Sequence, residues 1–324
     1  MADHSSGKKP ARAIALGIAC ASGSYKGVFV HGVLDCFEAA GLRADVYAAA
    51  SSSTVCAAYA AAGRLKELGG AAYWKRAWSA YAAGHDISAA VLAGIQEVLP
   101  SITGSLFGPN AARLAISVSE VTTAEAAELT QGQGARRLGQ QLVLATRTHD
   151  ASWARQNLRP VLFHTGEQDA RDQDARERDV REQEARGHAA RRRLTRDNLA
   201  EVAYATTRML HAWKTPAWIE QRPFVDASYT CSCPAVDLAE MGCRRVIAVS
   251  PESGPVYTDF FQSARLPDSH AGTPIRVIQP ARNLAEMGVD YLKVTGPGLD
   301  AAYGEGRRAG DAFVEEWFAA THAP

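Results

Sequence analysis

Three consecutive serines, Ser51 to Ser53, stand between an apolar stretch and an alanine-rich one, and this arrangement could make a nucleophile. Residues 44–50 predict a short buried strand, and residues 54–62 predict a helix that begins after a very tight turn. A serine at such a turn presents its hydroxyl beyond the end of the sheet, with a helix N-terminus behind it. The pattern is also typical of a Ser or Thr N-cap on an alanine-rich helix, and Ser52 or Ser53 could take the place of Ser51.

Two further segments could complete a site around Ser51. The loop at residues 22–27 (SGSYKG) lies between a predicted strand and a predicted helix, so its backbone N–H groups could hold a developing oxyanion. Asp226 follows a predicted strand far along the chain and could take the proton of a serine hydroxyl. These groups together could transfer an acyl group from an ester to Ser51 and then to water. An aspartate with an ordinary pKa of about 4 is a weak base, so Asp226 would need partial desolvation and a close hydrogen bond to Ser51.

With these segments the chain resembles the patatin-like phospholipase family, whose motifs are G-G-G-x-[RK]-G, G-x-S-x-G and D-G-[GA]. The matching segments here are SGSYKG at residues 22–27, AASSS at residues 49–53 and DAS at residues 226–228. The resemblance extends to residues 32–41, residues 144–146 with 160–163, residues 205–207, and residues 226–249. It therefore covers most of the chain outside a charged insertion and a weakly matching middle part.

The resemblance implies a Ser–Asp dyad without histidine, in which Ser51 is the nucleophile and Asp226 the base. Gly23 and Ser24 would offer the N–H groups of an oxyanion hole, and Lys26 would hold the basic position of its loop. The implied fold is an α/β, patatin-like, three-layer fold with a mainly parallel central sheet flanked by helices. The implied substrate is a lipid or another acyl ester, with no metal or organic cofactor.

Every motif departs from the family in the same way, because glycines are replaced by Ala or Ser. A Cβ atom costs energy wherever φ is positive, and it can crowd an approaching oxyanion. The replacements could alter the geometry, narrow the substrate range or abolish activity. Retention of Ser51, Lys26 and Asp226 favours an active enzyme.

Three other functions remain open. An acyltransferase or thioester-tailoring enzyme could use the same dyad, and a non-catalytic patatin-like protein could bind lipid without turning it over. A nucleotide-binding protein is the third, but residues 22–27 match neither G-x-G-x-x-G nor G-x-x-x-x-G-K-[ST]. Three histidines, His31, His85 and His211, are rivals of Asp226 for the role of base.

The order of predicted elements indicates a parallel sheet. Strands are expected at residues 13–19, 45–50, 245–250 and 275–279, a strand or hairpin arm at 218–225, and helices at 28–40, 54–62, 198–210, 234–242 and 298–320. Residues 64–129 read as helical, and residues 141–148 and 158–164 as two strands joined by a turn. Four aromatic residues at helical spacing predict core packing or, alternatively, the wall of an acyl-chain pocket: Tyr73, Trp74, Trp78 and Tyr81.

Residues 169–193 contain a pentad repeat: DARDQ, DARER, DVREQ, EARGH and AARRR. A five-residue period drifts around a helix and leaves no constant apolar face to bury. We therefore predict a charged insertion at about residues 167–196, either a solvated helix or partly disordered, with Arg191 to Arg193 on its surface. Residues 1–11 are expected to be a disordered N-terminus, and residues 12–324 a single domain.

The composition argues against nucleic-acid binding and against a membrane-spanning protein. The chain of 324 residues is 47% hydrophobic and carries 35 basic and 35 acidic residues, so nothing in its net charge indicates nucleic acid or a polybasic membrane patch. No stretch reaches the roughly 18 apolar residues of a membrane span. The six cysteines lack metal-site spacing and predict reduced thiols in a cytoplasm. Any membrane contact would be transient and local, and the oligomeric state is not predicted.

Overall fold

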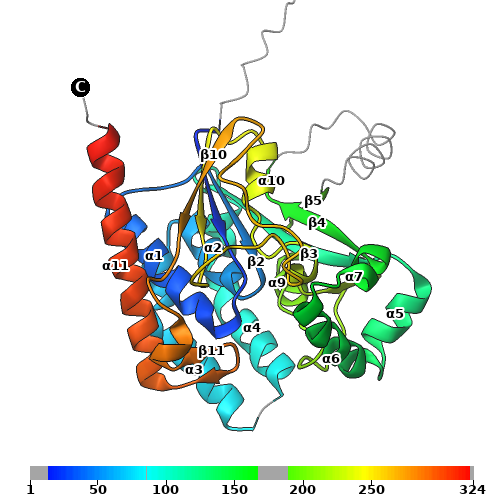
Figure 1. Cartoon of the computed structure of the whole chain (residues 1–324). Helices are drawn as coiled ribbons and strands as arrows, with labels where there is room; N and C mark the ends of the chain where they lie inside the picture. Colours follow the sequence, from blue (N-terminus) through cyan, green and yellow to red (C-terminus); the bar gives the residue numbers. More distant parts are fainter. Residues whose placement is uncertain (1–13, 85, 167–188, 322–324) are drawn as a thin grey trace, which may run out of the picture.

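The computed structural model describes residues 14–84, 86–166 and 189–321. Over these residues the centre of the molecule is a ten-stranded sheet with the main order β5-β4-β3-β2-β1-β8-β10-β9, in which β7 lies beside β3 and β6 beside β7. Helices cover both faces of the sheet, which gives three layers (Figure 1). The predicted α/β class with a mainly parallel central sheet is confirmed. The predicted disordered N-terminus, residues 1–11, lies outside the described residues.

The parallel part of the sheet buries side chains on both faces. Its strands are β1 (Leu16–Cys20), β2 (Val46–Ala50), β8 (Arg245–Val249), β10 (Thr273–Ile278) and the first part of β3 (Arg113–Val121). Ile18 and Tyr47 face one hydrophobic core, and their neighbours Ala19 and Val46 face the other. β1, β2 and β8 are buried on both faces and read as continuous apolar runs, which made them recognisable in the sequence. β10 was also predicted, but it exposes Pro274, Arg276 and Val277.

β3 joins this parallel part to an antiparallel part. It is parallel to β2 and antiparallel to both β4 (Leu158–His164) and β7 (Arg222–Val225). The prediction of a helical pattern over residues 64–129, with breaks at Gly84, Pro100 and residues 108–109, is therefore wrong at β3. Leu114, Ile116 and Val118 alternate as a strand requires, but alanine-rich helical segments on both sides hid the alternation.

Ten α-helices are bounded as follows within the described chain: α1 (Gly27–Ala39), α2 (Thr54–Ala62), α3 (Ala71–Ala82), α4 (Ile87–Leu106), α5 (Ala124–Gln131), α6 (Ala135–Ala145), α7 (Ser152–Asn157), α9 (Leu199–Ala205), α10 (Ala235–Glu240) and α11 (Gly296–Thr321). The strand predicted at residues 141–148 is wrong, because these residues belong to α6 and a following 3₁₀ turn. Leu138 and Leu142, four residues apart, are buried, whereas Leu144 is 56% exposed. This is the pattern of an amphipathic helix.

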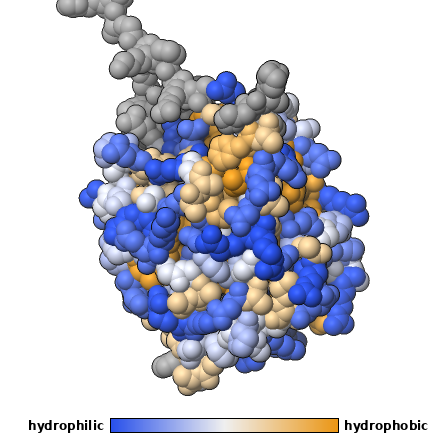
Figure 2. All heavy atoms as spheres, turned by 90° about the vertical axis from the view of Figure 1, so that its left-hand side faces the viewer, coloured by the Kyte–Doolittle hydropathy of each residue, from blue (hydrophilic) through white to orange (hydrophobic). Residues whose placement is uncertain are grey.

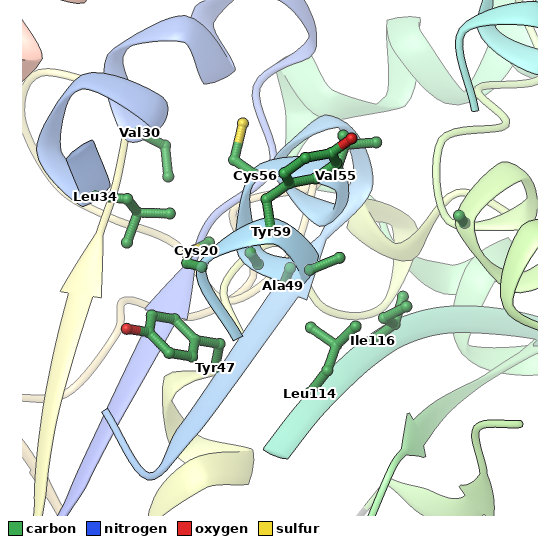
Figure 3. Close-up of a cluster of buried hydrophobic side chains, with 14 of the residues drawn as sticks. Cys20, Val30, Leu34, Tyr47, Ala49, Val55, Cys56, Tyr59, Leu114 and Ile116 are labelled. Atoms are coloured by element: carbon green, nitrogen blue, oxygen red, sulfur yellow. The ribbon is translucent and has the colours of Figure 1, made fainter. Parts of the chain in front are cut away.

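The core beneath the Ser51 turn is built from β1, β2 and β3 together with α1 and α2. Its side chains point toward one another between the sheet and the two helices (Figure 3). They include Cys20, Val30, Leu34, Tyr47, Ala49, Val55, Cys56, Tyr59, Leu114 and Ile116. Close packing of this kind fixes the direction of the chain as β2 ends and α2 begins.

The C-terminal helix α11 covers α1 along its length (Figure 1). Phe313 and Trp317 stack on it with ring centroids 5.6 Å apart, as their spacing of four residues predicts. The face of the molecule that carries α11 is mostly hydrophilic, with a confined apolar area (Figure 2). Phe318 and, on β10, Val277 are among the exposed large apolar side chains.

The end of the predicted charged insertion belongs to the sheet. Residues 190–193 form β5 (Ala190–Arg193), which pairs in parallel with β4. The placement of Arg191 to Arg193 on a solvated surface is wrong for Arg192, because its guanidinium contacts the buried carboxylate of Glu120 at 2.8 Å and lies over two phenylalanine rings. The rest of the pentad repeat, up to residue 188, lies outside the described residues.

Among the described residues, one helix, α4, has the length and apolar composition of a membrane-spanning helix. In this fold it packs against α2 and α9. Ile95, Leu99 and Ile102 are buried on that side. These contacts bury 33% of the apolar window of α4, so the helix is only partly buried in the fold.

Candidate active site

Ser51 occupies a strained turn between β2 and α2. Its φ angle is 54°, in the left-handed region that side chains other than glycine rarely adopt. The Ser51 side chain is only 6% exposed, and its Oγ donates a hydrogen bond to Oδ2 of Asp226 over 2.8 Å. The two residues that the sequence analysis paired are thus in direct contact, although 175 positions separate them.

The carboxylate of Asp226 is fully buried and accepts hydrogen bonds on both oxygens. Oδ1 accepts the N–H of Ser228 over 2.8 Å and the Ser228 hydroxyl over 2.6 Å. Burial raises the pKa of Asp226 to about 6, against the hydrogen bonds from Ser228 and Ser51, which lower the pKa. The aspartate is therefore a stronger base than an exposed one and is still ionised above pH 6.

The neighbouring serines do not compete with Ser51. Ser53 is fully buried and donates its hydroxyl to the backbone carbonyl of Ala21 over 2.7 Å. The Ser52 hydroxyl is buried and has no hydrogen-bond partner in the described structure. Only Ser51 of the three contacts the aspartate there, which resolves the register that the sequence left open.

Gly23 and Ser24, the predicted oxyanion residues, belong to the loop after β1. Both line the same cavity as Ser51, and Ser24 also has a positive φ angle, 51°. Within the described chain the backbone N–H groups of these two residues have no acceptor, whereas those of Tyr25 and Lys26 donate to the carbonyls of Tyr291 and Gly23. The Gly23 and Ser24 N–H groups are therefore available to donate hydrogen bonds to a ligand.

Lys26 has a different position from the one predicted. Its ammonium group is 4% exposed, hydrogen-bonds Glu252 over 3.0 Å, and lies 3.8 Å from Asp290 and 4.4 Å from the centroid of the Tyr291 ring. The backbone N–H of Lys26 donates to the carbonyl of Gly23. Lys26 therefore offers no group to the oxyanion position, contrary to its predicted place in the hole, but anchors the loop that carries Gly23 and Ser24.

The hairpin that receives Lys26 is formed by β11 (Val289–Asp290) and β12 (Lys293–Val294), which are antiparallel to each other. At its turn Tyr291 has a φ angle of 40°, and its carbonyl accepts hydrogen bonds from the Ser24 hydroxyl and the Tyr25 N–H. This contact joins the loop after β1 to residues near the end of the chain. The sequence carried no motif that would have predicted it.

A cavity of about 730 Å³ opens beside Ser51 and Asp226. Trp74 and Ala77 of α3, Ile87 and Ile95 of α4, and several residues of the loop at 250–262 line it. Its size lies within the range of small-molecule sites, roughly 300 to 1,000 Å³. Trp74 is buried in the core, as one interpretation of the α3 aromatics predicts, and it also lines this cavity. The alternative interpretation, an acyl-chain pocket, stays a prediction.

The histidines that could rival Asp226 are placed differently. His31 is fully buried and accepts a hydrogen bond from Trp74 on Nδ1, and burial lowers its pKa to about 4. His211 lines the cavity, and burial lowers its pKa as well. Neither contacts Ser51 or Asp226 by a hydrogen bond. His85 lies outside the described residues.

Thr206 was recognised only as part of a small-residue segment, yet it touches the dyad. Its Oγ1 accepts the backbone N–H of Ser51 over 2.8 Å and donates to the carbonyl of Ser117 over 2.7 Å. Ser119 donates its hydroxyl to the backbone carbonyl of Asp226 over 2.8 Å. Polar residues in the buried strand β3 were the signal that could have indicated these roles.

No group of three or more histidine, cysteine or acidic side chains that could hold a metal ion occurs among the described residues. No protein-family model matches the chain, and no curated protein is similar to it in sequence. What the protein does must therefore be inferred from the dyad, the loop and the cavity.

Proposed function

We propose that the protein is a serine acyl hydrolase, a lipase- or phospholipase A-like esterase of the patatin-like type. The single observation that carries this proposal is the 2.8 Å hydrogen bond between Ser51 Oγ and Asp226 Oδ2. The strained turn at Ser51, the free N–H groups of Gly23 and Ser24, and the adjoining cavity support it. These are the parts that nucleophilic acyl transfer needs.

In the proposed reaction Asp226 takes the hydroxyl proton as Ser51 Oγ attacks the ester carbonyl. The negative charge that develops on the carbonyl oxygen is stabilised by the N–H groups of Gly23 and Ser24. Collapse of the tetrahedral intermediate expels the alcohol, which receives the proton from Asp226, and leaves an acyl group on Ser51. Water, deprotonated by Asp226, then releases the acid and restores the serine.

The proposed substrate is a lipid or another acyl ester whose chain lies in the cavity between α3 and α4. Apolar and aromatic side chains such as Trp74 and Ile95 line this space, and contact with them would favour a hydrocarbon chain. The proposed reaction requires neither a metal nor an organic cofactor, because every proton and electron pair in it moves between Ser51, Asp226 and the substrate. We place the protein in the cytoplasm, where its buried thiols would stay reduced.

Removing either member of the dyad should abolish hydrolysis. We expect Ser51→Ala and Asp226→Asn each to lower kcat on p-nitrophenyl esters by roughly 1,000-fold or more, because the nucleophile or its base is lost. Circular dichroism would verify that both variants fold. A fluorophosphonate probe should label the wild type but not Ser51→Ala.

The matched control is Ser53→Ala, since the Ser53 hydroxyl is held by Ala21 and does not contact Asp226. This variant should still be labelled and active. Hydrolysis that survives both dyad substitutions would refute the proposal. A folded wild type that binds lipid vesicles but neither reacts with the probe nor hydrolyses any ester would instead indicate a non-catalytic lipid-binding protein.

A further inference from the structure

Thr206 follows directly after α9 and begins a short segment, residues 206–208, that contacts both halves of the dyad. Its side-chain oxygen accepts the N–H of Ser51, and its backbone carbonyl accepts the N–H of Ala227, the residue next to the proposed base, over 3.1 Å. Two residues later, the carbonyl of Arg208 accepts the N–H of Asp226 over 3.0 Å. The short segment 206–208 is thus bonded to the nucleophile on one side and to the aspartate turn on the other.

The hydroxyl of Thr206 both accepts and donates a hydrogen bond. It is completely buried, accepts one hydrogen bond from Ser51 and donates one to the carbonyl of Ser117 on β3. A buried N–H or carbonyl left without a partner is energetically unfavourable, so both hydrogen bonds resist displacement. The Ser51 N–H therefore has a fixed direction relative to β3.

The direction of this N–H matters because Ser51 is held at a positive φ angle. That angle is energetically unfavourable for a residue other than glycine, so the backbone relaxes away from it unless surrounding contacts prevent the change. The Thr206 hydroxyl is the side-chain group that hydrogen-bonds the backbone of Ser51 itself within the described structure. Relaxation of the turn would swing Ser51 Oγ away from Asp226.

We infer that Thr206 is a positioning residue that holds the Ser51 turn in register with Asp226 through its hydroxyl. This inference rests on the proposed function of the dyad and names the group that aligns it. Thr206 takes no proton and does not touch the reacting atoms. It acts on the rate by keeping Ser51 Oγ within hydrogen-bond distance of the carboxylate.

The test compares Thr206→Val with Thr206→Ser. Valine keeps the shape of threonine but removes both hydrogen bonds, so we expect kcat to fall roughly 10- to 100-fold, as for small misplacements of a reacting group, with KM nearly unchanged. Serine keeps the hydroxyl and should retain most of the activity. The rate of labelling by a fluorophosphonate should follow kcat in both variants.

A general loss of stability has to be separated from the loss of alignment. Thr273→Val is the matched control, because Thr273 is also buried and donates its hydroxyl to a distant backbone carbonyl, that of Cys243, over 2.9 Å. It lies on β10, away from the dyad. It should lower the unfolding midpoint to a similar extent without lowering kcat at a temperature where it is folded.

A second readout does not require catalysis. The Ser51 hydrogen bond lowers the pKa of Asp226, so Thr206→Val should raise that pKa. The shift is measured by carbon NMR titration of the Asp226 carboxyl. The groups that face this carboxylate are Ser51, Ser228 and, by its charge interaction, Tyr229, whose own buried phenol is bonded to the Leu210 N–H.

The outcomes are distinguishable. If wild-type protein shows no esterase activity, the proposed function fails, whereas the NMR titration still tests the contact. A folded Thr206→Val with wild-type kcat and an unchanged Asp226 pKa overturns the inference, and so does a Thr206→Ser that is as slow as Thr206→Val. Should Thr206→Val fail to fold, Thr206→Ala, which leaves room for water at the same position, takes its place in each comparison.

Discussion

At the scale of single residues, the site depends on how Asp226 is surrounded. Three donors reach its carboxylate, one from Ser51 and two from Ser228, and burial opposes them. The hydrogen bonds favour the ionised form, whereas burial favours the protonated one. Ser228 stands at a position where the family that the chain resembles has glycine or alanine, so its hydroxyl is a feature of this chain.

Removing the Ser228 hydroxyl should shift the pH dependence of the reaction. Ser228→Ala removes a 2.6 Å hydrogen bond to the ionised carboxylate, and the pKa of Asp226 should rise above its value of about 6. The acidic limb of the kcat/KM profile should move to higher pH, because the base must lose its proton to act.

Ser119→Ala is the matched control for this experiment. The Ser119 hydroxyl bonds the backbone carbonyl of Asp226 and not its carboxylate. The acidic limb of the kcat/KM profile of Ser119→Ala should therefore remain at the wild-type pH. Identical limbs in Ser228→Ala and wild type would contradict the role given to the Ser228 hydroxyl.

The sequence identified Ser51 and Asp226 because both follow apolar strands, and the chemistry of a serine at a tight turn is recognisable without its glycines. It did not place the Lys26 side chain, since whether a lysine faces the oxyanion or a distant glutamate depends on tertiary contacts that no local pattern encodes. The role of Thr206 was hidden for the same reason. Its partners, Ser51 and Ser117, lie 155 and 89 positions away.

At the scale of elements, β3 is the common support of the dyad. Ser51 follows β2, which pairs with the first part of β3, and Asp226 follows β7, which pairs with Ser119 and Glu120 farther along the same edge, because β4 occupies the opposite edge. The carbonyl of Ser117 and the hydroxyl of Ser119, both on β3, bind Thr206 and the Asp226 backbone. A strand that the sequence analysis missed therefore sets the distance between the two residues that it found.

Helices α1 and α11 approach closely because glycines face each other. A Cβ atom added at Gly306 would lie 2.1 Å from the carbonyl oxygen of Phe29, and one at Gly32 would lie 2.3 Å from that of Tyr303. Since helix backbones cannot yield as a flexible side chain can, either substitution must push the helices apart. The loop with Gly23 and Ser24 leads directly into α1.

Gly306→Ala should therefore destabilise the fold by about 1–3 kcal/mol, as is typical of overpacking. Gly304→Ala is its control on the same helix, because there the added Cβ comes no closer than 3.7 Å, to the end of the Arg308 side chain. Gly304→Ala should increase stability by about 0.5–1 kcal/mol through helix propensity. Urea unfolding measures both, and a Gly306→Ala as stable as Gly304→Ala would disprove the close packing.

The elements that were predicted correctly are those whose periodicity is decided locally. α1, α2, α10 and α11 and the strands β1, β2, β8 and β10 have apolar residues at regular spacing or capping glycines. α6 was mistaken for a strand because it carries four consecutive apolar residues, of which Leu144 turns outward. β5 was missed because its Arg192 is stabilised by Glu120 and by aromatic rings that come from other strands.

At the scale of the whole molecule, the buried dyad opposes stability. The pKa of Asp226 is higher in the folded state than in the unfolded chain, so folding binds a proton between pH 4 and pH 6. Its contribution to stability is most favourable below about pH 4 and decreases as the pH rises to about 6. Above that pH the ionised group costs roughly 3 kcal/mol.

Asp226→Asn should remove this cost. We expect the variant to be more stable than wild type at pH 8, by up to about 3 kcal/mol, and close to wild type at pH 4. Urea unfolding at the two pH values measures the difference. The carboxylate of Glu120 is also buried, but its interactions with Arg159 and Arg192 outweigh burial and lower its pKa. Its contribution to stability is the same in both proteins and cancels from the difference. Equal stabilities at pH 8 would contradict a buried, ionised Asp226.

The long separation of Ser51 and Asp226 has a consequence for the making of the protein. During synthesis the serine leaves the ribosome 175 residues before the aspartate, and β3, α9 and β7 must follow before the two can meet. A nascent or prematurely terminated chain therefore carries an alcohol with no base beside it. Under the proposed function, the active site can therefore form only after residue 226 of the 324 has been translated and β3, α9 and β7 have folded.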